Sequence, residues 1–303
     1  MVTQIKRLTK LLLTCSAVVA LGLCKSLSSG TTEVEVAEAL HRMGCELEFS
    51  FPSGVLCVSR VKVLTPTKEC FERLLHLSRL ECLEIKYMPS TMDQTNAQAL
   101  VALSNLRELE LNGEFFDDAA TSWVRSLTNL TSLKLLYTKL GDESLERLST
   151  LAKLEHLELI NYEPLTRRGG EAIARFKSLR SFRFYGRWDR TALMALKELP
   201  KLTSVTIGGE SVNDELAELR NIASLEEVTI ADATITDVTV AHLLEMKKIR
   251  SLSLQSCAIH DDALVKVKHL RLRALHFVRC SGRLGELTNA GSVYRVSELH
   301  LRH

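Results

Sequence analysis

The sequence has almost no excess of charge of either sign. Over 303 residues, 39 Lys and Arg residues are balanced by 37 Asp and Glu residues, so the formal net charge is only +2. A nucleic-acid-binding protein needs a strongly basic surface, because neutralising backbone phosphates supplies much of its affinity. We therefore expect no nucleic acid among the partners. A hydrophobic fraction of 46% predicts a folded body with a sizeable core.

Long apolar runs are also scarce. The uncharged run over residues 11–24 would rise about 21 Å as a helix, short of the roughly 30 Å hydrocarbon core of a bilayer. Lys6, Arg7 and Lys10 precede this run and small polar residues follow it, which is the order of a secretory signal. We therefore predict that residues 1–30 are a signal peptide or a membrane or lipid anchor. The protein is then exported to the periplasm, the cell envelope or the medium.

Cys24 is a candidate for lipidation. Residues 21–24 are similar to the cleavage box of bacterial lipoproteins, except that Leu23 stands where that family has Gly, Ala or Ser. An uncleaved apolar first helix is the alternative, and it would fit a cytoplasmic protein. In each case we expect membrane contact only through this N-terminal segment.

Motifs for metals, cofactors and catalysis are missing. The sequence has no CxxC pair, no Cys/His spacing of a zinc site and no Gly-rich phosphate loop, so we expect no metal and no cofactor. Gly169-Gly170 and Gly208-Gly209 lack the spacing of such a loop and are interpreted as turns. Acidic pairs recur where loops meet predicted helices, and we interpret them as helix caps: Asp117-Asp118, Asp142-Glu143 and Asp261-Asp262.

One short apolar cadence, Leu-x-x-Leu-x-Leu, dominates the sequence and recurs ten times at steps of 23 to 26 residues. The last three residues of the motif alternate between apolar and other residues, which is typical of a strand. In several units a Thr or Asp then follows, and after it apolar residues recur three and four apart, which is typical of a capped helix. Such a unit cannot bury its own apolar face, so neighbouring units must stack. The first positions are Leu80, Leu106, Leu130, Leu154, Leu179, Leu202, Leu225, Ile249, Leu272 and Val296, after a degenerate unit at Val58. Helices are predicted over residues 117–123, 142–148, 236–244 and 261–267.

This cadence resembles that of leucine-rich repeat proteins over about residues 55–303. The resemblance implies an α/β fold. This fold is a right-handed leucine-rich repeat solenoid, or horseshoe, of about 10–11 repeats, with a parallel β-sheet on its concave face and short helices on its convex face. Residues 230–243 and 249–264 look like the Ile-Thr-Asp-containing subtype of planctomycete-type bacterial exported proteins, a ribonuclease-inhibitor-like group. A related cysteine-containing subtype occurs in eukaryotic ubiquitin-ligase adaptors.

The start of the body resembles the cap that introduces the bacterial arrays. Residues 36–44 have a helical pattern, and residues 46–49 that follow have a strand pattern. The resemblance therefore divides the chain into residues 1–30 (the signal or anchor), residues 31–55 (a capping helix and strand) and residues 56–303 (the solenoid).

The ninth position of the repeat departs from the family pattern, which has Asn or Cys there. Cys257 and Cys280 follow the pattern and are predicted to be buried ladder thiols, with a disulfide between them as the alternative. Another cluster of four cysteines near the cap is expected to form disulfides of open connectivity: Cys45, Cys57, Cys70 and Cys82. The other ninth positions hold Glu114, Thr138, Tyr162, Glu210 and Ala233.

Outward strand positions of three central repeats compose a candidate protein-binding surface. An apolar column flanked by charged side chains is how binding hot spots are built. We expect Leu136, Ile160 and Tyr185 to form this column, with an aromatic and basic loop beside it. The candidate protein-binding residues are Lys134, Leu136, His156, Glu158, Ile160, Arg183, Tyr185 and Trp188.

The sequence thus predicts an exported, non-enzymatic protein–protein interaction module that binds a protein or peptide on its concave face. One alternative is an intracellular substrate-recognition adaptor of a ubiquitin ligase, as in the F-box-containing relatives. A structural cell-envelope protein is another, and an enzyme such as a hydrolase with an exposed His or Cys is a third. The ligand and the oligomeric state stay open.

Overall fold

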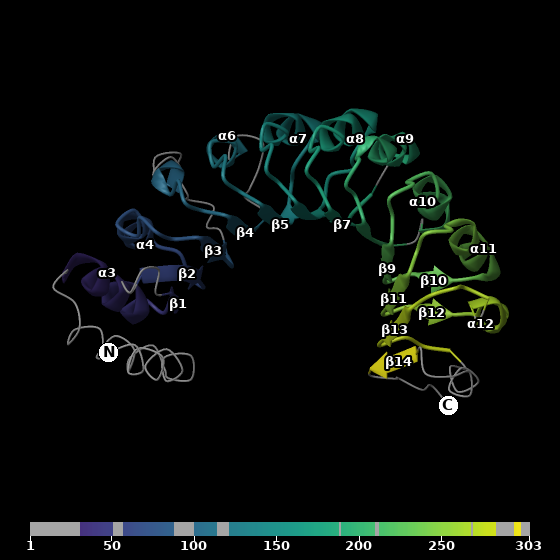
Figure 1. Ribbon diagram of the computed structural model, residues 1–303. Coiled ribbons are helices and arrows are strands. Elements are labelled where there is room, and N and C mark those ends of the chain that lie inside the picture. The colour runs from purple at the N-terminus through teal and green to yellow at the C-terminus, as the bar shows by residue number, and fades with distance from the viewer. Residues whose placement is uncertain are drawn as a thin grey trace, which may run out of the picture. The chain divides into compact units, whose positions relative to one another are not determined.

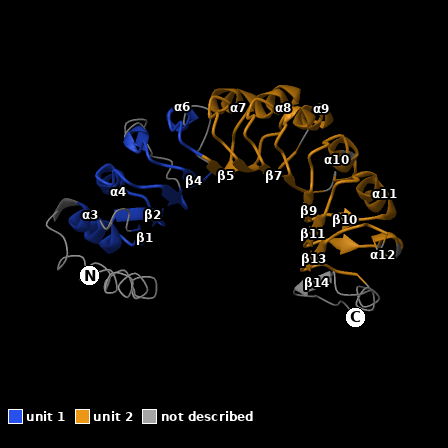
Figure 2. Cartoon of the chain, viewed as in Figure 1, with its two compact units in different colours: residues 1–130 blue, residues 131–303 orange. Residues whose placement is uncertain are grey.

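The structure of the protein is a computed structural model. It describes residues 31–50, 57–87, 100–113, 121–187, 189–209, 212–267, 269–282 and 294–297. The chain divides into two compact units, Met1–Leu130 and Thr131–His303, which we call unit 1 and unit 2 (Figure 2). The predicted signal or anchor with Cys24, and the candidate residue Trp188, lie outside the described residues. Within the described ranges, no helix is both long and apolar enough to cross a membrane.

The described part of unit 1 begins with a helix and a strand, in the segment for which the sequence predicts them. Strand β1 pairs antiparallel with β2, and β2, β3 and β4 pair in parallel, so β1 covers the first edge of the parallel strands. Its elements are α3 (Thr31–Arg42), β1 (Glu46–Ser50), β2 (Cys57–Val63), α4 (Lys68–Leu74), β3 (Cys82–Ile85), η2 (Leu100–Ala102), β4 (Glu108–Asn112) and α6 (Thr121–Val124).

Unit 2 repeats a strand and a short helix. Its parallel strands follow the order β5-β6-β7-β8-β9-β11-β13-β14, and β10 pairs with β12 in a small second sheet. The strands are β5 (Ser132–Thr138), β6 (His156–Asn161), β7 (Ser181–Tyr185), β8 (Ser204–Gly208), β9 (Glu227–Ala231), β10 (Thr234–Ile235), β11 (Ser251–Gln255), β12 (Ala258–Ile259), β13 (Ala274–Val278) and β14 (Tyr294–Ser297). The helices are α7 (Asp142–Leu148), α8 (Arg167–Ile173), α9 (Arg190–Met194), η3 (Ala195–Glu198), α10 (Val212–Leu219), α11 (Asp237–Glu245) and α12 (Asp261–Val267).

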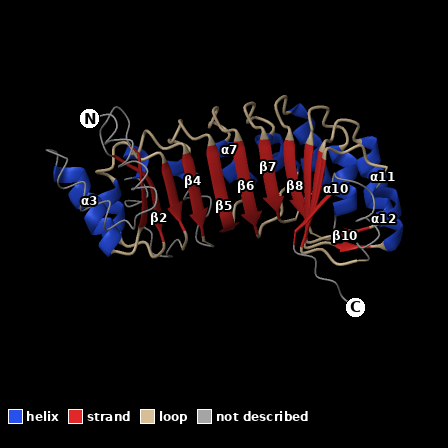
Figure 3. Ribbon diagram, turned by 60° about the horizontal axis from the view of Figure 1, so that its bottom comes forward, coloured by secondary structure: helices blue, strands red, loops and turns tan. Residues whose placement is uncertain are grey.

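The apolar cadence forms the core between the strand layer and the helix layer (Figures 1 and 3). Leu133, Leu157 and Phe182 lie side by side on β5, β6 and β7, and each is at most 2% exposed. The α/β repeat with a parallel sheet and short helices is therefore confirmed. In the last repeat the sequence placed Val296 at the first position, which is wrong, because Val296 pairs with Phe277, a strand residue of the preceding repeat; the rest of that predicted unit lies outside the described residues.

The start of helix α11 follows the cap that the sequence predicts, whereas the starts of α7 and α12 differ. The Thr236 side chain accepts a hydrogen bond from the Thr239 N–H, and the Thr239 side chain accepts one from the Thr236 N–H, a reciprocal capping box before α11. The acidic pairs of α7 and α12 are not caps, as they were predicted to be: they lie in the first helical turn, where they complement the helix dipole, and the N-cap residue of α7 is Gly141, which makes no side-chain hydrogen bond to the helix. The pair at 117–118 lies outside the described residues.

The eighth position of the cadence turns the chain out of the strand. In four repeats a residue other than glycine has a positive φ there, at a cost of about 1–2 kcal/mol each. Gly113 and Gly209 take the same place in two further repeats, with φ values of 157° and 114°. The four are Tyr137, Asp232, Ser256 and Arg279, with φ between 50° and 57°.

Two glycine pairs differ in their roles. Gly209 is a turn residue, as predicted, but Gly208 is not, because it is the last residue of strand β8. Gly169 and Gly170 are not, because both are buried within helix α8. A Cβ on Gly170 would lie 2.2 Å from the carbonyl oxygen of Ala192 in α9, so the absence of a side chain lets the two helices approach closely.

The ninth position of the repeat, which holds the ladder residue, falls at Tyr162 by counting along the sequence, but in the structure Asn161 has this role at the end of strand β6. Strand pairing aligns Asn161, not Tyr162, with Thr138, because Tyr137 is an extra, bulged residue in β5. The buried Asn161 amide donates to the carbonyl oxygens of Leu140 and Glu163, each at 2.8 Å, and its Oδ1 accepts from the Leu140 N–H at 2.9 Å. An asparagine ladder residue is therefore present in this repeat.

Cys257 and Cys280 are free, buried thiols in adjacent repeats. The Cys257 Sγ lies 3.4 Å from the Ile230 carbonyl oxygen, and the Cys280 Sγ lies 3.2 Å from that of Leu254. Each thiol thus donates to the preceding strand, which is the ladder arrangement. The neighbouring Cys280 thiol, together with burial, raises the pKa of Cys257.

Candidate functional site

Three strands of unit 2 bring the predicted apolar column together. Leu136 on β5 is the lateral partner of Ile160 on β6, and Ile160 is the partner of Tyr185 on β7. All three side chains are half-buried and point away from the leucine core, because neighbours in a strand alternate between faces. We call this surface, with the charged residues beside it, the β5–β7 face.

A row of charged residues runs parallel to the column. Strand register aligns Lys134 with Glu158 and Glu158 with Arg183. The Arg183 Nη1 lies 3.4 Å from the Glu158 Oε1, and the two side chains are 46% and 19% exposed. An ion pair at this exposure contributes roughly 0–1 kcal/mol, so its main effect is to fix the direction of both side chains.

Tyr185 extends the column toward β8. The ring lies over Gly208, where an added Cβ would be 3.1 Å from Cδ1 and 3.2 Å from Cε1 of the tyrosine. Burial raises the pKa of Tyr185; Arg183 opposes this shift, and Glu158 and Asp232 reinforce it. The phenol therefore stays neutral and keeps a hydroxyl that can donate a hydrogen bond from an apolar surface.

This shift predicts a pH dependence. Because the pKa of Tyr185 is higher in the folded than in the unfolded chain, its contribution to stability is complete below pH ~10 and is lost as the pH rises toward the folded-state value. In a tyrosinate absorbance titration we expect Tyr185→Phe to remove the transition at the highest pH. Tyr87→Phe, at a ring that is 71% exposed, is the control and should leave that transition in place. An unchanged titration of Tyr185→Phe would contradict the assignment.

His156 lies on the same face as the column but at the other end of the strands. It is exposed, and its lateral partners are Ser132 on β5 and Ser181 on β7. Of the eight predicted binding residues, the structure therefore places seven on three adjacent strands. Trp188 is the eighth, outside the described residues.

Two exposed tyrosines beside the column were missed at the level of sequence. Tyr137 and Tyr162 are 46% and 49% exposed, and their ring centroids are 6.5 Å apart at an interplanar angle of 40°. Tyr137 follows Leu136 directly, and its positive φ turns it out of the strand. Tyrosine pairs of this kind are common at protein interfaces. The two aromatic residues are visible in the sequence, but counting to the ninth position of the repeat gave Tyr162 the role of a buried ladder residue instead of a surface residue.

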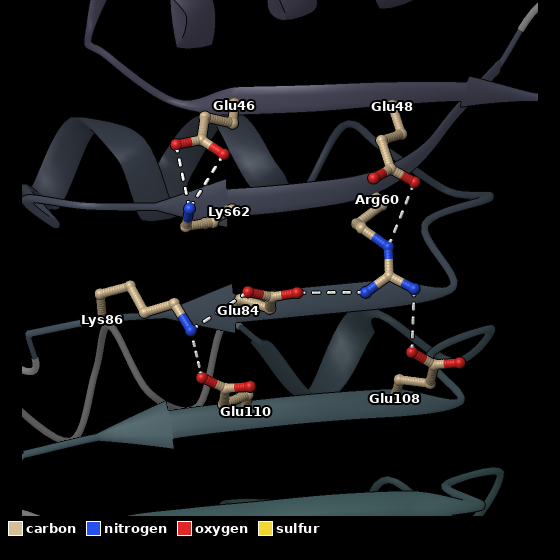
Figure 4. A network of polar contacts seen from close by, with 8 residues as sticks. All are labelled: Glu46, Glu48, Arg60, Lys62, Glu84, Lys86, Glu108 and Glu110. Carbon is tan, nitrogen blue, oxygen red and sulfur yellow. Dashed lines mark hydrogen bonds and ion pairs between the residues drawn. The ribbon is translucent and has the colours of Figure 1, made fainter. Parts of the chain in front are cut away.

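The strand face of unit 1 has a different character, because a network of charged residues covers it (Figure 4). Arg60 on β2 is its centre, and its three guanidinium nitrogens lie 3.3 Å from Glu48, 3.1 Å from Glu84 and 3.0 Å from Glu108. The hydrogen-bonded and ion-paired residues are Glu46, Glu48, Arg60, Lys62, Glu84, Lys86, Glu108 and Glu110.

This network puts charged residues at strand positions that are apolar on the β5–β7 face. Lys86 occupies the repeat position that Ile160 has in unit 2, and it bridges Glu84 and the buried Glu110. Its pKa is raised: burial alone would lower it, but the hydrogen bonds and charges of the two carboxylates outweigh that effect. On this face five carboxylates are paired with three cations, whereas the β5–β7 face presents an apolar strip.

The repeat pattern matches a known family. The model of the family described as "Leucine-rich repeat region" matches residues 46–231, which is more than half of the chain. The chain is a leucine-rich repeat protein. Leucine-rich repeat domains generally mediate protein–protein interactions and are typically binding modules without enzymatic activity.

Individual relatives of this leucine-rich repeat protein are distant or partial. The receptor-like protein EIX1 of Solanum lycopersicum is 44% identical over 77 residues, which are 25% of this chain and 7% of that protein. The chain thus spans a small part of that relative. The crystal structure of an internalin, InlF, of Listeria monocytogenes is 18% identical with a TM-score of 0.46, and the match covers 78% of this chain and 71% of that one. Internalin C2 of the same species is 17% identical with a TM-score of 0.38, over 73% and 81% of the chains.

Proposed function

We propose that this leucine-rich repeat protein binds a protein or peptide partner on the β5–β7 face, without catalysis. The observation that carries the proposal is the register of Leu136, Ile160 and Tyr185 on three adjacent, hydrogen-bonded strands. Because the backbone of these strands is already fixed, a partner that covers the column removes apolar surface from water without ordering a loop. The partner's own charges would meet Lys134, Glu158 and Arg183.

Binding without catalysis is favoured by the state of the nucleophiles. All six cysteines in the described part of the chain are buried, so a substrate does not reach their thiols. His156 has serines, not carboxylates, as its lateral partners, and a histidine base is normally oriented by an acid or a carbonyl. Among the described residues, no group of three or more His, Cys, Asp or Glu is arranged to hold a metal ion.

The test is a binding measurement with a partner isolated on the full chain. We expect the triple variant Leu136→Ala, Ile160→Ala, Tyr185→Ala to bind that partner at least about 100-fold more weakly, since three central contacts each contribute at least 1–2 kcal/mol. The matched control is Met194→Ala, Val238→Ala, Leu244→Ala, which removes three apolar side chains that are 46%, 49% and 42% exposed on helices of unit 2. This control should stay within about threefold of the parent.

The two triple variants separate the possible sites. Equal binding by the parent and the column variant would place the site on the helices or loops and overturn the proposal. The same conclusion follows if the helix control loses binding instead. A column variant that has lost its circular dichroism spectrum would be replaced by Tyr185→Ala alone. Capture of no partner at all would favour the structural cell-envelope role.

We further propose that the protein is exported and belongs to the bacterial Ile-Thr-Asp-containing, ribonuclease-inhibitor-like subtype. The support is the basic N-terminus ahead of the uncharged run 11–24 and the segment Ile235-Thr236-Asp237, which enters helix α11. Mass spectrometry of the N-terminal peptide of protein from its source cells tests export. An intact, unmodified N-terminus would favour the intracellular adaptor, and a diacylated Cys24 would show a lipid anchor.

A further inference from the structure

Four cysteines of unit 1 are buried within a short stretch of chain. Cys45, Cys57, Cys70 and Cys82 are free thiols that are between 0% and 5% exposed. Disulfides were expected among them, and none of the four is bonded to another in the structure. Their positions nevertheless decide which pair is able to form a bond.

Strand pairing excludes every pair without Cys70. Cys57 lies opposite Ser50, five residues and roughly 15 Å along the chain from Cys45. Cys82 lies opposite Arg60, which is three residues and roughly 10 Å from Cys57. Cys45 and Cys82 are separated by the width of strand β2, so roughly 10 Å or more lies between them. A disulfide needs Cα atoms within about 7 Å, so none of these pairs can close.

Cys45 and Cys70 are neighbours beside the contact between α3 and α4. The Cys70 Sγ lies 3.5 Å from the Met43 Sδ, two residues before Cys45, and Cys70 adds to the effect of burial in raising the pKa of Cys45. The ends of two packed helices hold both backbones in place: the Cys45 N–H donates to the Leu40 carbonyl of α3, and the Cys70 N–H donates to the Thr67 side chain that caps α4. The end of α3 and the first turn of α4 therefore hold the two cysteines near one another.

We propose that Cys45 and Cys70 are a disulfide-forming site that locks helix α3 onto helix α4. The oxidant is the disulfide of a thiol–disulfide exchange catalyst or of oxidised glutathione. One cysteine thiolate attacks that disulfide and releases a thiolate, and the second cysteine then attacks the mixed disulfide. Two S–H bonds are lost and one S–S bond forms, while two electrons and two protons pass to the oxidant, which becomes two thiols.

The closed structure makes this reaction slow once the protein has folded. Burial, followed by the neighbouring Cys70, raises the pKa of Cys45 to about 12, so very little reactive thiolate exists near neutral pH. The bond therefore forms while the chain folds or when α3 lifts away. The other two thiols have different neighbours: the Arg79 Nη1 lies 3.0 Å from the Cys57 Sγ, and Cys82 lies near Arg60 and Glu108.

The test maps disulfides in the full chain. The reduced, unfolded protein is refolded in a glutathione redox buffer, its free thiols are alkylated, and tryptic peptides are analysed without reduction. Trypsin leaves Cys45 and Cys57 together in residues 43–60 and Cys70 in residues 69–73, so the variants Cys45→Ser and Cys57→Ser are needed to tell them apart. We expect the linked pair of peptides in the parent and in Cys57→Ser, and its loss in Cys45→Ser.

Other outcomes overturn the proposal. These are a link that survives in Cys45→Ser, a link that contains Cys82, and complete alkylation of the refolded parent. Thermal unfolding tests whether the Cys45–Cys70 bond stabilises the protein. Reduction should lower the Tm of Cys57→Ser by roughly 5 °C and that of Cys45→Ser by less than about 1 °C. Equal shifts in the two variants would also count against it. Neither readout depends on what the β5–β7 face binds.

Discussion

Replacement of Asn161 by leucine should destabilise unit 2 by about 3–4 kcal/mol, although the two side chains have similar volumes. The substitution removes a side chain that is 6% exposed and bonded to three backbone groups. The N–H and the carbonyl of Leu140 would then lose this partner in a buried site, and the carbonyl of the exposed Glu163 would lose it where water can take its place. Each such loss costs about 1–3 kcal/mol when no water replaces it. Urea unfolding followed by circular dichroism measures the effect.

Tyr162 provides the control for this prediction. It is the next residue, and its side chain is 49% exposed. If the register of the structure is correct, Tyr162→Ala should cost less than about 1 kcal/mol, because a half-exposed ring leaves no buried polar group behind. A larger loss for Tyr162→Ala than for Asn161→Leu would contradict the register and restore the ladder role that repeat counting assigns to the tyrosine.

The error at this position shows where counting along the sequence stops working. The repeats differ in length by one to three residues, and spacing alone does not reveal where the extra residue lies. The structure places it at Tyr137, after the last core leucine of β5, so the strand faces are unaffected and only the ladder shifts. The column Leu136, Ile160 and Tyr185 lies before that point, which is why its register was predictable.

Long side chains were less predictable than strand faces. Strand alternation puts Glu108 and Glu110 on the same face of β4, but it does not show that Arg60 reaches across β3 to Glu108 or that Lys86 bridges two strands. Such contacts depend on side chains of four or more bonds, whose direction is not set by strand periodicity. The charged network on unit 1 therefore required the three-dimensional structure.

Gly170→Ala should also destabilise unit 2, by about 3 kcal/mol. In most helices the same substitution increases stability. At an open helical site, alanine gains up to about 1 kcal/mol over glycine. Here the added Cβ would lie 2.2 Å from the carbonyl oxygen, 2.5 Å from the Cα and 2.7 Å from the carbonyl carbon of Ala192. All three are backbone atoms of α9, so the helices must separate and lose part of their apolar packing. A Tm equal to or above that of the parent would contradict this close approach.

Two further variants separate a backbone clash from a side-chain clash. At Gly169 the nearest atom to an added Cβ is the Asp142 Oδ1, at 2.3 Å, and this carboxylate is the movable end of a side chain. Gly169→Ala should therefore cost less than Gly170→Ala, about 1–2 kcal/mol, because Asp142 also accepts a hydrogen bond from the Thr166 N–H and would lose it on turning away. The double variant Gly170→Ala, Ala192→Gly should not recover stability, since it removes only the Cβ of residue 192 and leaves the obstructing backbone in place. Recovery in that double variant would show that a side chain, and not the backbone of α9, requires glycine at position 170.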